Sequence, residues 1–206
     1  MNTMRILTAA ALVSAFAVTT VQAQPTQRVR GTIEKVDGNT LLLKSPTGAP
    51  VTLTLTDNAV IVGVLKASVA DIKEGSYIGS GAMPQPDGTQ KAVEVHIFAE
   101  SQRGQGDGHR DGWDGTAYGS GVGTMTNGAV GQAVTSVDGP VITVKYQGGE
   151  KKVVVGPNTP IVRYEVGEKS ELKPGAAIAV AAATKKADGS FEAARINVGR
   201  NGVVPN

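Results

Sequence analysis

The sequence predicts an all-β protein in which two related small barrels follow one another along the chain. Short β-branched or apolar runs alternate with turns such as Asp-Gly, Gly-Gly and Pro-Thr-Gly, where glycine permits a positive φ. The same pattern returns after about 100 residues, as expected when one structural unit occurs twice. The turn pattern and its repetition together predict two copies of one β domain.

Residues 1–23 precede the first copy and have the composition of a secretory signal peptide. Arg5 is followed by the apolar run Ile6–Val18 and by Val21-Gln22-Ala23, which resembles an A-x-A cleavage site. The thirteen-residue run is shorter than the roughly 20 residues of a membrane-spanning helix. We expect cleavage after Ala23, and therefore an exported protein with the periplasm as the default location and extracellular release as the alternative.

The composition of the expected mature chain, 183 residues from Gln24, excludes several classes of protein. The absence of cysteine removes disulfides, thiolate metal ligands and thiol nucleophiles. Loss of Arg5 leaves 19 basic and 18 acidic residues, a balance that gives no electrostatic footprint for nucleic acid or anionic lipid. We therefore expect no nucleic-acid partner and no membrane span after signal removal. The partner is an unknown envelope protein or small ligand, and the oligomeric state stays open.

The two copies keep the order and spacing of their residues. The first copy reads GTIEKVDGNTLLLK from Gly31, and the second reads QAVTSVDGPVITVK from Gln132. Other corresponding residues are Lys44 and Lys145, Ile61 and Ile161, and Gly75 and Gly175. We expect the first barrel over residues 28–98, a Gly-rich linker over 99–130, the second barrel over 131–199 and a C-terminal tail over 200–206.

Five strands are expected in each copy. In the first copy they are the runs 29–36, 40–44, 51–55, 77–83 and 91–98. After the third run, residues 68–73 end at Gly75, and residues 170–173 of the second copy end at Gly175, as a single helical turn terminated by glycine would. Five strands with a short helix after the third form the element order of the OB-fold. Each copy is therefore expected to be a small OB-like barrel.

A resemblance to known proteins supports this expectation. The sequence VRGTIEKVDGNTLLL at 29–43, with Ile-Lys-Glu-Gly at 72–75, resembles an uncharacterised domain that recurs in secreted bacterial proteins. The resemblance implies a small barrel and export, and it supplies no reaction. The whole chain, including 104–114 and 125–127, looks like alphaproteobacterial exported proteins that are sometimes automatically named metal transporter permeases. The sequence contradicts that name, because a permease needs membrane spans.

The densest polar cluster of the sequence lies in the expected linker. Asp107, His109, Asp111 and Asp114 fall within eight residues of glycine-rich sequence. Carboxylates and an imidazole on such a loop could converge on a divalent metal ion, the only cofactor that the sequence suggests. The spacing matches no calcium-loop motif, because the glycine and the terminal glutamate of an EF-hand are missing. The alternative is a solvated, turn-rich segment whose acids neutralise neighbouring arginines.

Two further residues are weaker candidates for a site. Strand alternation places Glu94, His96 and Phe98 on the outer face of their strand, so His96 joins the metal site only if it lies beside His109. Trp113 is the only tryptophan. It is expected to dock on a barrel surface and to hold the linker there, with a ligand platform as the alternative role.

The sequence shows no catalytic motif. It has no thiol, its two histidines lie far apart, and it lacks a G-x-S-x-G elbow. Aromatic residues are scattered, whereas a barrel that stacks bases or sugars gathers them. The leading hypothesis is an exported, non-enzymatic binding or interaction module. A metal-handling protein that uses the Asp/His cluster is the first alternative, and a carboxylate-based hydrolase is the second.

Overall fold

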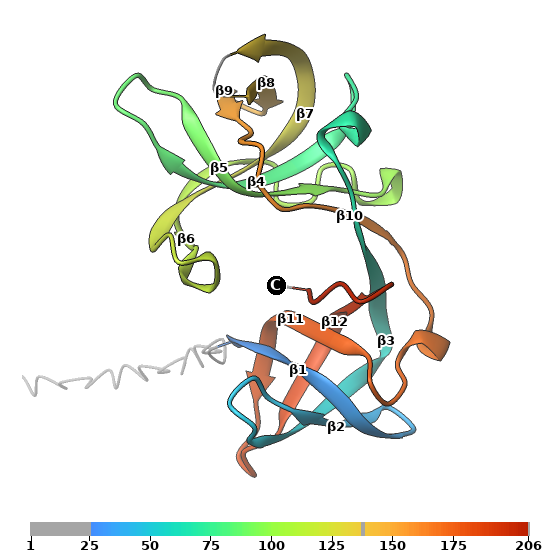
Figure 1. Ribbon diagram of the computed structural model, residues 1–206. Helices are drawn as coiled ribbons and strands as arrows, with labels where there is room; N and C mark the ends of the chain where they lie inside the picture. Colours follow the sequence, from blue (N-terminus) through green and yellow to red (C-terminus); the bar gives the residue numbers. More distant parts are fainter. Residues whose placement is uncertain (1–25, 137–138, 206) are drawn as a thin grey trace, which may run out of the picture.

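The computed structural model describes residues 26–136 and 139–205, and β-strands make up most of this part of the chain (Figure 1). The predicted signal peptide lies outside the described residues. The strands are β1 (Thr26–Asp37), β2 (Thr40–Lys44), β3 (Pro50–Lys66), β4 (Tyr77–Pro84), β5 (Gln90–Ile97), β6 (Gly108–Asp114), β7 (Val122–Ser136), β8 (Gly139–Tyr146), β9 (Gly149–Val154), β10 (Ile161–Val166), β11 (Ala177–Lys185) and β12 (Phe191–Gly199). In the described ranges, no helix is long and apolar enough to cross a membrane.

Five of these strands form a closed barrel, which confirms the predicted all-β class. β1 pairs with β2 and β11, β2 pairs with β3, and β12 pairs with both β11 and β3. Only the β12–β3 pairing is parallel. Leu41 and Leu43 of β2 are fully buried in the barrel core, whereas Leu42 between them is exposed, because successive side chains of a strand point to opposite faces.

A second group of five strands also pairs in a ring, which we call the second ring. β4 pairs with β5 and β7, β7 pairs with β8, and β8 pairs with β9. The ring is completed by two residue pairs between β5 and β9, Gln90 with Val153 and Lys91 with Val154. Its interior is a separate apolar core that includes Ile78, Val95 and Val144.

Neither group of strands comes from one copy of the repeat. The closed barrel combines β1, β2 and β3 of the first copy with β11 and β12 of the second. The second ring combines β7, β8 and β9 of the second copy with β4 and β5 of the first. Figure 1 shows this exchange, with orange and red β11 and β12 beside blue β1. The strands therefore pair across the copies, whereas we expected 28–98 and 131–199 each to close a barrel of its own.

The exchange depends on β3 and β10, which carry the chain between the two groups of strands. They pair antiparallel, with Tyr164 opposite Val64 and Val166 opposite Val62. Residues 64 and 164 hold equivalent positions in the two copies, so an internal twofold axis passes between them. The flanking hydrogen bonds obey the same symmetry: the amide of Ala67 donates to Ile161 O (2.8 Å), and that of Gly167 donates to Ile61 O (2.9 Å).

The structure corrects the alignment at the start of the second copy. The amide of Gly175 donates to Ile33 O, and that of Gly75 donates to Val130 O, both at 2.8 Å. Val130 is therefore the counterpart of Ile33, and the counterpart of Gly31 is Gly128 instead of Gln132. Both glycines lie so close to a carbonyl of the neighbouring strand that a Cβ would clash with it. The four-residue difference lies in the β7–β8 hairpin, where 13 residues separate Val130 from its partner Val144, against nine between Ile33 and Leu43.

The segments expected to contain a helical turn and a linker are more ordered than the sequence suggested. The helical turns are single 3₁₀ turns, η1 (Val69–Asp71) and η4 (Lys169–Glu171). Residues 99–130, expected to be a linker, hold the short turns η2 (Glu100–Gln102) and η3 (Thr116–Tyr118), the strand β6 and the first half of β7. β6 pairs with β7 along its length. The glycine-rich composition concealed this pairing, because it uses backbone groups and needs no apolar side chains.

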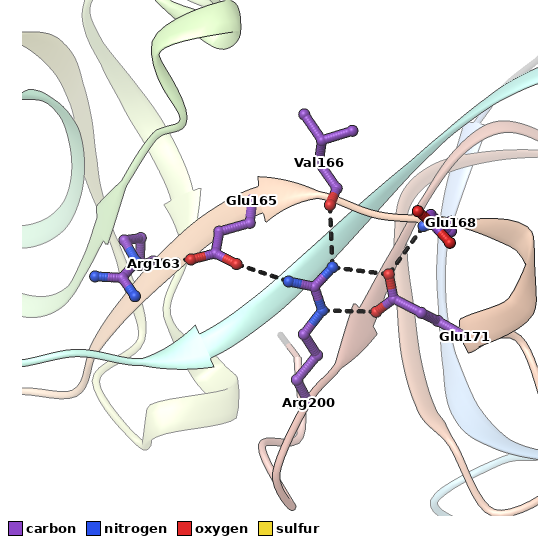
Figure 2. Close-up of polar contacts among 6 residues, drawn as sticks. All are labelled: Arg163, Glu165, Val166, Glu168, Glu171 and Arg200. Carbon is purple, nitrogen blue, oxygen red and sulfur yellow. Dashed lines mark hydrogen bonds and ion pairs between the residues drawn. The ribbon is translucent and has the colours of Figure 1, made fainter.

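An arginine after β12 ties the C-terminal segment to the crossing strands (Figure 2). The Arg200 guanidinium donates to both carboxylate oxygens of Glu171 (2.7 Å each), to Glu165 (2.7 Å) and to Val166 O (3.0 Å). Gly63 leaves room for the guanidinium, because a Cβ there would clash with it. These hydrogen bonds from Arg200 lower the pKa of the Glu171 carboxyl below its ordinary value.

Replacing Arg200 by alanine is expected to lower the free energy of unfolding at pH 7 by about 1–2 kcal/mol, as for a partly exposed bidentate pair. Because the folded-state pKa of Glu171 is depressed, this stabilisation is present above the unfolded-state pKa and is lost as the pH falls through the folded value. Urea unfolding at pH 7 and pH 3 measures both effects. Lys186→Ala, which removes the exposed pair with Glu192, is the control with a smaller expected loss. An equal loss at both pH values would contradict this explanation.

A cut between the copies tests the strand exchange. We expect a chain cleaved at a protease site engineered between Ser120 and Gly121 to keep both fragments together, because five strands of the N-terminal fragment pair with strands of the other. Native mass spectrometry should then report the intact mass, and separation should require denaturant. Fragments that separate in plain buffer would show that each copy closes on itself.

Candidate functional site

A groove runs along the second ring beside β5. It consists of two adjoining depressions of about 540 and 470 Å³ that share Lys91, Gly156 and Pro157. The first depression reaches the β4–β5 turn at residues 85–89, and the second extends along β5 to Tyr118. Each volume lies in the range of small-ligand sites, so the groove is large enough for an extended molecule.

The groove exists because β5 parts from one partner strand before it meets the next. It leaves β9 after the pair Lys91–Val154 and meets β10 at the pair Val95–Ile161. Residues 155–160 bulge away between these points, and Pro157 and Pro160 within them have no N–H to donate to β5. The bulge is anchored at its end, where the amide of Val95 donates to Pro160 O (3.0 Å).

The equivalent place in the closed barrel is more tightly paired. There β3 stays in strand conformation and has a bulge of the same length, but β12 forms one further pair on each side of it, Ala193–Leu55 and Arg195–Val60. The counterpart of Val60 is Pro160, and the described ladders of β5 lack the two corresponding residue pairs, although the Val95 amide donates to Pro160 O. The sequence GPNTP at 156–160, in place of TDNAV at 56–60, thus accompanies a shorter strand pairing on both sides of the bulge in one copy of the unit.

The charge at this place is also reversed between the copies. Lys91 is exposed in the groove, and its counterpart in the closed barrel is Glu192, which pairs with Lys186 at 2.8 Å. Within residues 26–136 and 139–205, Lys91 has no ion-pair partner. The nearby Asp87 carboxylate accepts hydrogen bonds from the amide (2.9 Å) and hydroxyl (2.7 Å) of Thr89, which lower its pKa. The Lys91 ammonium is thus available to a ligand.

A buried polar network lies behind the inner end of the groove. The hydroxyl of Tyr118 donates to Glu94, whose carboxylate is also 3.0 Å from His96 Nε2. Tyr164 of β10 stacks on the His96 ring at 5.0 Å, and burial, followed by the Glu94 charge, raises the pKa of its hydroxyl. Glu94 is only 4% exposed. The expected outer face of β5 is therefore covered, and the prediction that Glu94 is exposed was wrong.

The linker and β10 provide this cover, and Trp113 is central to it. Trp113 is 8% exposed and packs its ring against Gly81 of β4, where a Cβ would clash with the indole. Tyr118 stacks on the indole at 6.2 Å. The docking that we expected of Trp113 is thus observed, and the indole positions Tyr118 instead of presenting an open face to a ligand.

Three residues of the Asp/His cluster have separate structural partners, and the fourth, Asp111, is exposed. Asp107 accepts from the hydroxyl of Tyr77 (3.2 Å), and Asp114 accepts from the amide of Thr116 (3.0 Å). His109 Nδ1 lies 2.8 Å from the Thr126 hydroxyl, while Asp111 is exposed on β6. Burial, followed by the charge of Lys151, lowers the pKa of His109.

The cluster and the weaker candidate His96 do not come together as metal ligands. His96 contacts Glu94 and Tyr164, whereas His109 stacks on Tyr146. Across the described ranges, no three His, Asp or Glu side chains gather at one point. The physical reason is that residues 108–114 form a strand, whose rise of roughly 3.3 Å per residue holds even side chains on one face about 7 Å apart, and not a loop that could wrap an ion. Metal handling therefore stays a prediction from composition.

Comparison of the chain with family models, with curated proteins and with solved structures finds no match. The evidence about the site thus comes from the chain itself. Sequence reasoning missed Lys91, Glu94 and Tyr118, together with the bulge at 155–160. The differences between the copies could have indicated the site. Pro157 and Pro160 have no proline at the corresponding positions of the first copy, and Lys91 corresponds to Glu192 of the second copy.

The packing of the indole gives a direct test of the inner end of the groove. Gly81→Ala should displace Trp113, lower the free energy of unfolding by about 1–3 kcal/mol as overpacking does, and shift the tryptophan emission to longer wavelength. Emission is specific because the chain has one tryptophan. Gly156→Ala is the control, since its Cβ would meet only the Thr159 hydroxyl at 3.5 Å. Unchanged emission in Gly81→Ala would mean that the indole is not seated on β4.

Proposed function

We propose that the protein is an exported, non-enzymatic binding module that takes an extended anionic ligand in the groove beside β5. The observation that carries this proposal is the difference between two otherwise related copies. Only the second ring combines an opened strand pairing with a cation that has no ion-pair partner in the described chain. A structural repeat alone requires neither feature.

The framework supports a binding role because it holds the groove walls in place. The pairing order β1–β2–β3–β12–β11 and the equivalent order β7–β8–β9–β5–β4 match that of OB-like barrels, and we propose that both groups of strands are such barrels. One groove wall belongs to the first copy and the other to the second. Exchanged strands therefore fix the width of the groove, which reduces the ordering cost of binding.

The lining of the groove indicates the chemistry of the ligand. Lys91 offers a flexible point charge, suited to a carboxylate or a phosphate. Asn158 and Thr159 add polar groups, and Pro157 and Pro160 add rigid apolar surface. A ligand with alternating polar and apolar parts and an anionic group fits this arrangement.

Titration of the isotope-labelled mature chain with defined probes tests the proposal. The probes are a glutamate-containing peptide of about five residues, its glutamine counterpart, and a phosphate oligomer of similar length. We expect at least one anionic probe to shift the amide signals of 85–93 and 154–160, with the glutamine peptide binding weakly. The two anionic probes distinguish carboxylate from phosphate recognition.

Substitution at the cation provides the matched variant. Lys91→Glu should weaken binding about tenfold, equivalent to roughly 1.4 kcal/mol, and should reduce its dependence on salt. Lys44→Glu, an exposed change on the closed barrel, is the control and should leave binding unchanged. No amide shifts with any probe, or equal weakening by both variants, would overturn the proposed site.

A further inference from the structure

Because strands of one copy pair with strands of the other, the same strand pairs could form between two molecules. β1 pairs with β11 and β3 with β12, while β7 pairs with β4 and β9 with β5. The only covalent link between the N-terminal half (26–102) and the C-terminal half (from 108 onward) is the segment 103–107. β6 follows this segment and pairs with β7, so it belongs to the C-terminal half.

This link is the segment at which an exchange of halves between two molecules would have to hinge. Residues 103–107 are exposed, and Gly104 adopts a φ of +84°, which side chains other than glycine rarely adopt. Its hydrogen bonds reach both halves. Arg103 donates to Gly75 O (2.8 Å) and Asp107 accepts from the Tyr77 hydroxyl (3.2 Å), while Gln105 accepts from Arg195 (2.8 Å) and Asp107 accepts from the Gln147 amide (2.7 Å). Extending five residues could span about 17 Å.

We propose that two copies of this chain form a closed dimer by exchanging halves about residues 103–107. The N-terminal half of each chain pairs with the C-terminal half of the other, and the same strand pairs and cores form as in the monomer. Only residues 103–107 change their conformation and their hydrogen bonds. The monomer is favoured in dilute solution because its halves are held at an effective concentration in the millimolar range. The dimer forms when chains refold at comparable concentration, and it then persists because exchange requires the strands to separate.

Two cysteine pairs distinguish the exchanged dimer from an ordinary one. Thr32 and Ala177 face each other across the antiparallel β1–β11 pair, which joins the two halves. Thr40 and Thr54 face each other across β2–β3, within the N-terminal half. Such antiparallel partners have the separation that a disulfide needs. The chain has no other cysteine, so the Thr32→Cys/Ala177→Cys and Thr40→Cys/Thr54→Cys variants each form one defined bond per pair.

The mature chain is unfolded, refolded over a hundredfold range of concentration, oxidised and separated by size. We expect the dimer-to-monomer ratio to rise in proportion to chain concentration. On a denaturing, non-reducing gel, the dimer of Thr32→Cys/Ala177→Cys should run as linked chains, and that of Thr40→Cys/Thr54→Cys as single chains. Monomer at every concentration overturns the proposal. A dimer whose Thr32→Cys/Ala177→Cys bonds stay within single chains also overturns it, because such chains associate without exchange.

A pair of valine substitutions tests the hinge separately. Gly104 and Gly48 both have a positive φ (+84° and +87°) and open space around a Cβ, so valine adds backbone strain and no clash at either position. Gly104→Val should raise the dimer-to-monomer ratio by about fivefold or more, because the extended hinge relieves the strain. Gly48→Val lies in the β2–β3 turn, which is the same in both forms, and should leave the ratio unchanged. Equal ratios in the two variants would show that 103–107 is not the hinge. This test is independent of ligand binding in the groove.

Discussion

The antiparallel pairing of β3 with β10 is the constraint on which the rest of the structure depends. Each strand leaves the group of strands in which it began and delivers the next two strands to the other group. Tyr164 lies at the centre of the pairing and, with Val62 and Val64, forms a small core of its own. Arg200 adds ion pairs with Glu171 and Glu165 at one side of the pairing. Because the crossing is fixed at its centre and its edge, the closed barrel and the second ring cannot be separated without breaking strand pairs.

The positions of most strands could be predicted from the sequence. Which strands pair to close each group could not. Period-two alternation and glycine turns located β1, β2, β4 and β5 to within a few residues. The third strand was expected to end at Leu55, but it continues to Lys66 because residues 60–66 pair with β12 and β10. A barrel can be completed by the last two strands of its own copy or by those of the other copy. The local sequence pattern does not distinguish these cases, since the pairing order is the same. The distinction depends on contacts between residues about 100 positions apart.

The candidate site shows a similar division. Composition drew attention to Asp107, His109, Asp111 and Asp114, but composition does not say which way side chains point. In the structure three of them hydrogen-bond to neighbouring residues, and Asp111 is exposed. The groove depends on an interrupted pairing and on Lys91, whose significance emerges only when each copy is compared with the other. A residue that breaks the repeat is more informative here than a residue that is chemically reactive.

The late position of β11 and β12 affects how the chain must be made. Synthesis proceeds from the N-terminus, so β1, β2 and β3 exist before residues 177–199 that complete their barrel. At roughly 5–20 residues per second, this leaves the early strands with open edges for on the order of ten seconds. Open edges invite pairing with other chains, so a nascent molecule needs either a holding factor or rapid completion. Interlocking thus gives the finished protein its rigidity and delays its folding until almost the whole chain is present.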